Sequence, residues 1–165
     1  MIAYNQILVE SLTGALETMA FMTIDQVEED MSVPKNIVFS EISFNCPQKI
    51  GKVQIIAGID FTKAVAEAYG AQENPDVSIC LDALKEVTNV TLGLLLPRIT
   101  YSPLDFFNIS VPVVYMADGK TDWLEFTSQE NCCICNFGGF LIAARLLLEY
   151  SDKYGDCICS SDRPK

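Results

Sequence analysis

The sequence predicts a single α+β domain in which long helices pack on a largely antiparallel or mixed β-sheet. Residues 3–22 and 76–96 carry apolar side chains at helical spacing, whereas residues 36–45 alternate apolar and polar side chains as strands do. The chain has 165 residues and 50% of them are hydrophobic, which suits one folded domain and excludes a disordered protein. We expect this domain to cover residues 1–150 and a polar, flexible tail to cover residues 151–165.

The first part of the chain predicts a helix, a hairpin and a second helix. Between residues 3 and 22, the following apolar side chains fall on one helical face: Ile7, Leu8, Leu12, Ala15, Leu16 and Met19. After a polar loop, strands over 36–45 and 52–59 are expected to pair as a hairpin. Asp60 is then expected to cap a short helix that ends at Gly70.

The next segment predicts a longer helix. It begins near Asp76 or Val77, after the turn residues at 71–76, and it continues to about Leu96. Pro97 is expected to end it, because proline has no N–H for the helical hydrogen bond and its ring crowds the preceding turn.

The remaining segments are predicted as strands. Residues 108–117 form one of them, with Pro112 at an edge of the sheet or at the start of a strand, and Asp118-Gly119 then turns the chain into a strand over 122–128. Residues 132–150 are expected to form two strands joined at Gly138-Gly139, although the end of this segment also has helical propensity.

Composition excludes several classes of function. Asp and Glu number 22 against 11 Lys and Arg, and the net charge of −11 disfavours nucleic acids and anionic membranes as partners. The chain contains no histidine, which excludes imidazole-dependent nucleophiles and imidazole metal ligands. Because the sequence starts without a signal-peptide pattern and has no apolar run long enough to span a bilayer, we expect a cytoplasmic protein.

The helix predicted over 76–96 carries a polar stripe. At about 100° per residue, four residues fall on one face within roughly 60° of one another: Asp82, Glu86, Asn89 and Gly93. We call them the acid–amide stripe. The opposite face, expected to pack on the sheet, carries Cys80, Leu84, Val87, Thr91 and Leu94. By itself, such a polar face is typical of any solvated helix, so its meaning depends on its context.

That context consists of four segments. They are ESLTGALETM at 10–19, the hairpin from Gly51 to Gly58 that leads into DFTKAVAEAYG, DALKEVTNVTLG at 82–93, and FNISVPVVYMADG at 107–119. Together they resemble the CheX/CheC family of chemotaxis phosphatases, and the resemblance covers most of residues 5–130. It is closer to CheX, because one Glu-x-x-Asn is present and Thr13 replaces the asparagine of a second signature in the first helix.

The resemblance implies a CheC-like fold and a catalytic role for the acid–amide stripe. The implied substrate is the aspartyl phosphate of a CheY-type response regulator. Asn89 would hold the attacking water, Glu86 would pair with a lysine of the regulator, Asp82 would lie at the rim, and Gly93 would let the partner's backbone approach. The chain would need no metal or cofactor of its own, since the regulator supplies Mg²⁺ in its active site. A homodimer is also implied by the resemblance, although the periodicity does not indicate one.

Two other interpretations stay open. The same exposed stripe would serve a non-catalytic CheX-like module that binds a phosphorylated regulator or another signalling partner without hydrolysing it. A thiol redox or metal protein would depend on the cysteines at 132, 133, 135, 157 and 159. We favour packing roles for the first three, with Cys133 and Cys135 on one face of a strand and Cys132 on the other.

Overall fold

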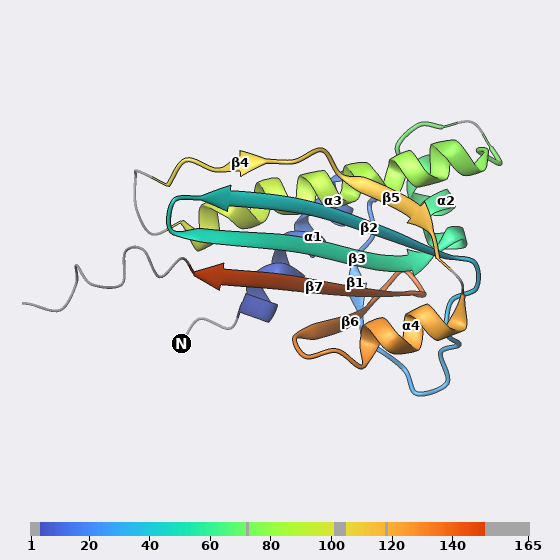
Figure 1. The fold of residues 1–165 in the computed structure, drawn as a ribbon. Helices are drawn as coiled ribbons and strands as arrows, with labels where there is room; N and C mark the ends of the chain where they lie inside the picture. Colours follow the sequence, from blue (N-terminus) through green and yellow to red (C-terminus); the bar gives the residue numbers. More distant parts are fainter. Residues whose placement is uncertain (1–3, 72, 101–104, 118, 151–165) are drawn as a thin grey trace, which may run out of the picture.

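The computed structural model describes residues 4–71, 73–100, 105–117 and 119–150, and it has the expected α+β architecture (Figure 1). The predicted tail 151–165 and Asp118 lie outside the described residues. The helices are α1 (Tyr4–Ala20), α2 (Ile59–Ala68), α3 (Val77–Ile99) and α4 (Lys120–Thr127). The strands are β1 (Ile24–Asp25), β2 (Ile37–Cys46), β3 (Lys49–Gly58), β4 (Asn108–Ile109), β5 (Val113–Met116), β6 (Cys132–Phe137) and β7 (Phe140–Tyr150).

The strands form one sheet in the order β1-β6-β7-β3-β2-β4, and β5 also pairs with β2. Every strand pairing within the described ranges is antiparallel. The predicted hairpin between β2 and β3 is confirmed, and so is the hairpin between β6 and β7. Gly138 and Gly139 both have positive φ, 58° and 88°, as a two-residue hairpin turn requires.

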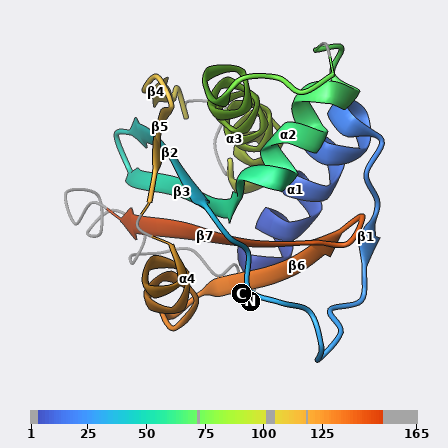
Figure 2. The ribbon, with the colours of Figure 1, turned by 90° about the vertical axis from the view of Figure 1, so that its right-hand side faces the viewer.

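The two faces of the sheet are covered differently. Helices α1, α2 and α3 lie on one face and α4 lies on the other (Figures 1 and 2). Side chains alternate accordingly along β3, where Ile55 belongs to the core under α1 to α3 and Ile56 packs with Trp123 and Phe126 of α4. The first face therefore holds the main core, and the second face is covered only over part of its described area.

Two helix boundaries differ from the prediction. The N-cap of α2 is Gly58, and Asp60 lies within the first turn, because the Ile59 N–H donates to the Asn36 carbonyl and the chain passes directly from β3 into the helix. Pro97 lies inside α3, which continues to Ile99. Ile99 is buried, and the Lys49 ammonium donates to its carbonyl oxygen at 2.7 Å, so the final turn is stabilised despite the proline.

The strand predicted over 122–128 is wrong, because this segment forms α4. Trp123 and Phe126 are both buried and stand three residues apart, which places them on one face of a helix. The strand predicted over 108–117 is interrupted. β4 and β5 flank Pro112, which has no N–H to donate, and both pair with β2 at the sheet edge, as expected for that residue.

Candidate functional site

The candidate site lies on α3, whose start and rotation are fixed by two polar contacts. The helix begins at Val77, within the predicted start, and the side chain of Asp76 caps it by accepting a hydrogen bond from the Ile79 N–H at 3.0 Å. Within the helix, the buried hydroxyls of Thr88 and Ser40 are hydrogen-bonded at 2.8 Å, which joins α3 to β2. Leu84, Val87 and the other apolar residues on this side pack into the main core. The opposite side of α3 consequently faces away from the sheet.

The acid–amide stripe lies on that outward side. All four residues, Asp82, Glu86, Asn89 and Gly93, are exposed. Asp82 forms an i,i+3 ion pair with Lys85 at 3.6 Å. In the part of the chain that the structure describes, the side chains of Glu86 and Asn89 make no hydrogen bond or ion pair, so both can bind a partner without losing an internal contact. A Cβ added at Gly93 would meet no atom of the described residues within 4 Å.

One residue assigned to the packing face is exposed. Leu94 was expected to pack on the sheet, but 41% of its surface is accessible. It follows Gly93 on the helix and packs close to Gly14 of α1. A Cβ at Gly14 would lie 3.3 Å from the Cδ1 atom of Leu94. Leu94 therefore lies at the rim of the α1–α3 contact and adds an apolar surface beside the stripe.

Glu86 and Asp82 also border a groove that the sequence did not reveal. The groove has a volume of about 330 Å³ and runs between α2 and α3. Tyr69 at the end of α2 and Ile79 and Ala83 of α3 contribute apolar walls. The exposed fraction of Tyr69 is 65%, so a large aromatic side chain stands in solvent near the two acids. An apolar groove edged by carboxylates suits contact with a partner that presents a cation beside an apolar side chain.

The counterpart position on α1 has a different chemistry. Glu10 forms an ion pair with Arg98, and hydrogen bonds from Gln6 and Arg98 lower the pKa of its carboxyl. The Thr13 hydroxyl donates to the Val9 carbonyl within the same helix at 2.8 Å. At these positions α1 thus presents a carboxylate that is already paired and a threonine in place of the amide, whereas Glu86 and Asn89 of α3 have no partner among the described residues.

The cysteines occupy packing positions. Cys133 and Cys135 contact the main core, and Cys132 packs with the cluster under α4, which confirms the predicted division of faces. Burial, with a smaller contribution from neighbouring cysteines, raises the pKa of the Cys132 and Cys135 thiols to about 11. Among the described residues, no three Cys, Asp or Glu side chains are grouped so that they could hold a metal ion. Cys157 and Cys159 lie outside those residues.

The comparisons with known proteins agree on one fold. A CheX from Desulfovibrio desulfuricans is 19% identical, with a TM-score of 0.67 over 90% of this chain and 100% of that one. A CheX from Vibrio vulnificus is 20% identical, with a TM-score of 0.66 over 88% of this chain and 96% of that one. The CheX of a CheX–CheY–BeF₃–Mg²⁺ complex from Borrelia burgdorferi is 17% identical, with a TM-score of 0.65 over 90% and 99%.

No protein-family model and no curated protein matches the chain. Within the described ranges, no helix has both the length and the apolar character needed to cross a bilayer. The likeness to the solved structures covers nearly the whole of each of the three proteins. The chain therefore has the fold of the CheX and CheC-like chemotaxis proteins, as the resemblance of its sequence implied.

Proposed function

We propose that this chain is a phosphatase that hydrolyses the aspartyl phosphate of a CheY-type response regulator, with α3 as the surface that enters the regulator's phosphate site. The observation that carries the proposal is the exposure of Glu86 and Asn89, about one helical turn apart and without internal partners in the described chain. The similarity in fold to a CheX crystallised with CheY, BeF₃ and Mg²⁺ supports the choice of partner.

Asn89 is the residue that we assign to the attacking water. A carboxamide is too weak a base to deprotonate water, but its oxygen accepts and its NH₂ group donates hydrogen bonds. It can therefore hold a water molecule in line with the phosphorus, and this positioning removes part of the entropic barrier to hydrolysis. The absence of histidine from the chain is compatible with this chemistry, because the carboxamide does not need to titrate.

Glu86 is assigned to docking. Its carboxylate would pair with a lysine at the regulator's phosphate site and fix the register of the two proteins. Glu86 lines the groove between α2 and α3, so an apolar side chain of the regulator can pack in the groove while the ion pair with Glu86 forms. Asp82, already paired with Lys85, stands at the rim and contributes less.

The remaining chemistry belongs to the regulator. Mg²⁺ bound there, together with its lysine, would neutralise the charge on the phosphoryl oxygens in the transition state. Gly93 supports docking in another way, because the open space over its backbone lets the partner's main chain come close.

A time course of dephosphorylation tests the proposal. A panel of phosphorylated receiver domains is incubated with and without the chain, and at least one is expected to lose its phosphate faster when the chain is present. Asn89→Ala should remove this acceleration and leave binding intact, because the side chain is exposed and makes no hydrogen bond to any described residue. Glu86→Lys should weaken binding by placing like charges together. Asp82→Ala, on the same stripe, is the matched control and should change little.

The outcomes separate the two leading interpretations. Full acceleration by Asn89→Ala would refute the mechanism. Binding of a phosphorylated receiver by the unaltered chain without any acceleration would favour the non-catalytic module instead. The homodimer and the cytoplasmic location implied above stay predictions, and sedimentation equilibrium of the purified chain tests the first of them.

A further inference from the structure

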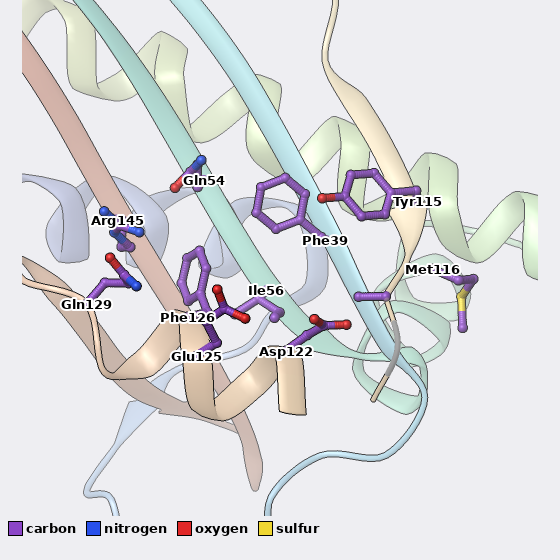
Figure 3. A pocket seen from close by; sticks show the side chains of 11 residues that line it. Phe39, Gln54, Ile56, Tyr115, Met116, Asp122, Glu125, Phe126, Gln129 and Arg145 are labelled. Carbon is purple, nitrogen blue, oxygen red and sulfur yellow. The ribbon is translucent and has the colours of Figure 1, made fainter. Parts of the chain in front are cut away.

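A second concave site lies on the sheet face opposite α3. It is a pocket of about 500 Å³ between β2, β3, β5, β7 and α4 (Figure 3). This volume falls in the range of small-molecule sites, which is about 300–1,000 Å³. The site is separated from the acid–amide stripe by the sheet itself, so the proposed phosphatase chemistry does not use it.

Aromatic side chains form the apolar wall of this pocket. The ring of Phe39 lies 5.0 Å from that of Tyr115 and 6.1 Å from that of Phe126, measured between centroids. Phe126 is buried, Phe39 is partly buried and Tyr115 is half exposed, so the rings form a continuous surface from the core to the solvent. Such a surface favours a flat, aromatic or apolar body.

Arg145 supplies a positive charge at one side of the pocket, next to Gln129 (Figure 3). Its guanidinium lies over the Phe126 ring at 5.6 Å from the centroid. Of the two arginines in the described part of the chain, Arg98 pairs with Glu10, whereas no described carboxylate lies within ion-pair distance of Arg145. A partly buried cation with no described carboxylate in ion-pair contact is unusual in a chain of net charge −11.

Two buried polar atoms at this side of the pocket have no hydrogen-bond partner among the described residues. One is Nε of the Arg145 guanidinium itself, and the other is Oε1 of Gln54, which is the cross-strand neighbour of Arg145 on β3. Gln54 is held by its other end, because its Nε2 donates to Glu41 at 2.7 Å. The guanidinium of Arg145 also donates no hydrogen bond to any other described residue, and a carboxylate can accept two guanidinium hydrogen bonds in parallel.

The acids of the pocket limit the charge of the ligand. Asp122 and Glu125 of α4 also line it, so the pocket contains two carboxylates and one guanidinium. A phosphate ester or a dicarboxylate would be repelled, whereas a single negative charge placed at Arg145 would gain an ion pair and a hydrogen bond. We propose that this pocket binds a small aromatic monocarboxylate, with its carboxylate on Arg145 and its ring against Phe39, Tyr115 and Phe126.

The test is a titration of the isotope-labelled full chain, followed by NMR, with indole-3-acetate and its uncharged analogue indole-3-acetamide. The carboxylate should bind saturably below about 10 mM and at least about tenfold more tightly than the amide. The shifted signals should come from the Gln54 side-chain amide, the Arg145 side chain and α4. Equal affinity for the two probes, absence of saturation by the carboxylate, or shifts confined to α3 would overturn the proposal.

Three variants identify the cation. Arg145→Gln should weaken binding of the carboxylate at least about tenfold. Gln129→Glu should weaken binding of the carboxylate as well, because it places a negative charge beside the guanidinium. Gln129 is exposed and outside the core, so this variant keeps the test valid if Arg145→Gln does not fold. Lys52→Gln removes a cation from β3 outside the pocket and should leave the affinity unchanged within about twofold. Unchanged affinity in Gln129→Glu would contradict the assigned position of the carboxylate.

Discussion

The buried hydroxyls of Thr88 and Ser40 are hydrogen-bonded at 2.8 Å and join α3 to β2 one residue before Asn89. Successive helical residues are separated by about 100°, so a side chain that points to the sheet at position 88 turns its neighbour at position 89 away from the core. Thr88 also contacts the Leu84 carbonyl at 2.8 Å, which ties it to its own helix. The contact with Ser40 is therefore a positional constraint on the candidate site as well as a core contact.

Thr88 and Thr91 form a natural pair for a stability experiment. Both are fully buried in α3, but the Thr91 hydroxyl has no hydrogen-bond partner among the described residues. Thr91→Val removes a buried hydroxyl that has no described hydrogen-bond partner. Because burying such a hydroxyl costs free energy, the variant should stabilise the fold by about 1 kcal/mol. Thr88→Val leaves Ser40 without its partner and should destabilise it by about 1–2 kcal/mol. Urea unfolding of both variants gives the comparison, and equal losses would show that Thr91 is satisfied after all.

Gly93→Ala should raise the stability of the fold and at the same time weaken docking of the partner. No atom of the residues that the structure describes lies within 4 Å of the added methyl group, and alanine in a helix interior is more stable than glycine by about 0.5–1 kcal/mol. We therefore expect a higher free energy of unfolding together with weaker binding to the phosphorylated receiver, since the methyl group occupies the space proposed for the partner's backbone. Thermal melting and a binding titration measure the two effects.

The matched control for Gly93→Ala is a helix position outside the stripe. Lys85→Ala changes a partly exposed residue on the same helix and leaves the open surface at Gly93 as it is. If Gly93→Ala binds the receiver as tightly as the unaltered chain, the partner's backbone does not approach α3 at this point, and the glycine has another explanation.

The thiols of Cys132 and Cys135 should react slowly. Their pKa values are raised to about 11 from the ordinary 9.0, chiefly by burial, so the thiolate is scarce at neutral pH. Alkylation by iodoacetamide should be at least about tenfold slower than for free cysteine at pH 7.5 and should still rise with pH above 9. Peptide mapping by mass spectrometry follows each residue separately. Fast labelling of Cys132 at neutral pH would favour the redox interpretation.

Much of the fold could be predicted because local chemistry and tertiary packing agree. Asp76 caps α3, Gly138 and Gly139 adopt the positive φ of a hairpin turn, and the apolar faces of α1 and α3 pack as their periodicity indicates. The helix α4 was missed because its buried residues, Trp123 and Phe126, give only one i,i+3 spacing. An eight-residue segment is too short for the helical repeat of apolar side chains to be recognised. Here burial against the second face of the sheet decides the structure.

The two concave sites were beyond prediction for a different reason. The exposure of Glu86 and Asn89 follows from periodicity within one helix, so the sequence sufficed for it. The pocket around Arg145 assembles residues from four strands and one helix, including the unforeseen α4. The groove beside Glu86 likewise combines Tyr69, at the end of α2, with Ile79 of α3. No sequence pattern records such contacts, because they depend on how separate elements pack.

The ion pair between Lys49 and Asp105 predicts a large and specific loss of stability. The two side chains are only 1% and 2% exposed, their charged atoms are 3.4 Å apart, and Lys49 also donates to the end of α3 at Ile99. Asp105→Asn removes the negative charge from a buried ammonium, and breaking such a pair on one side costs about 3–5 kcal/mol. Lys52→Met breaks the exposed pair with Glu41 and should cost less than about 1 kcal/mol. Urea unfolding compares the two, and similar small losses would mean that the Lys49 ammonium reaches water once Asp105 is neutral.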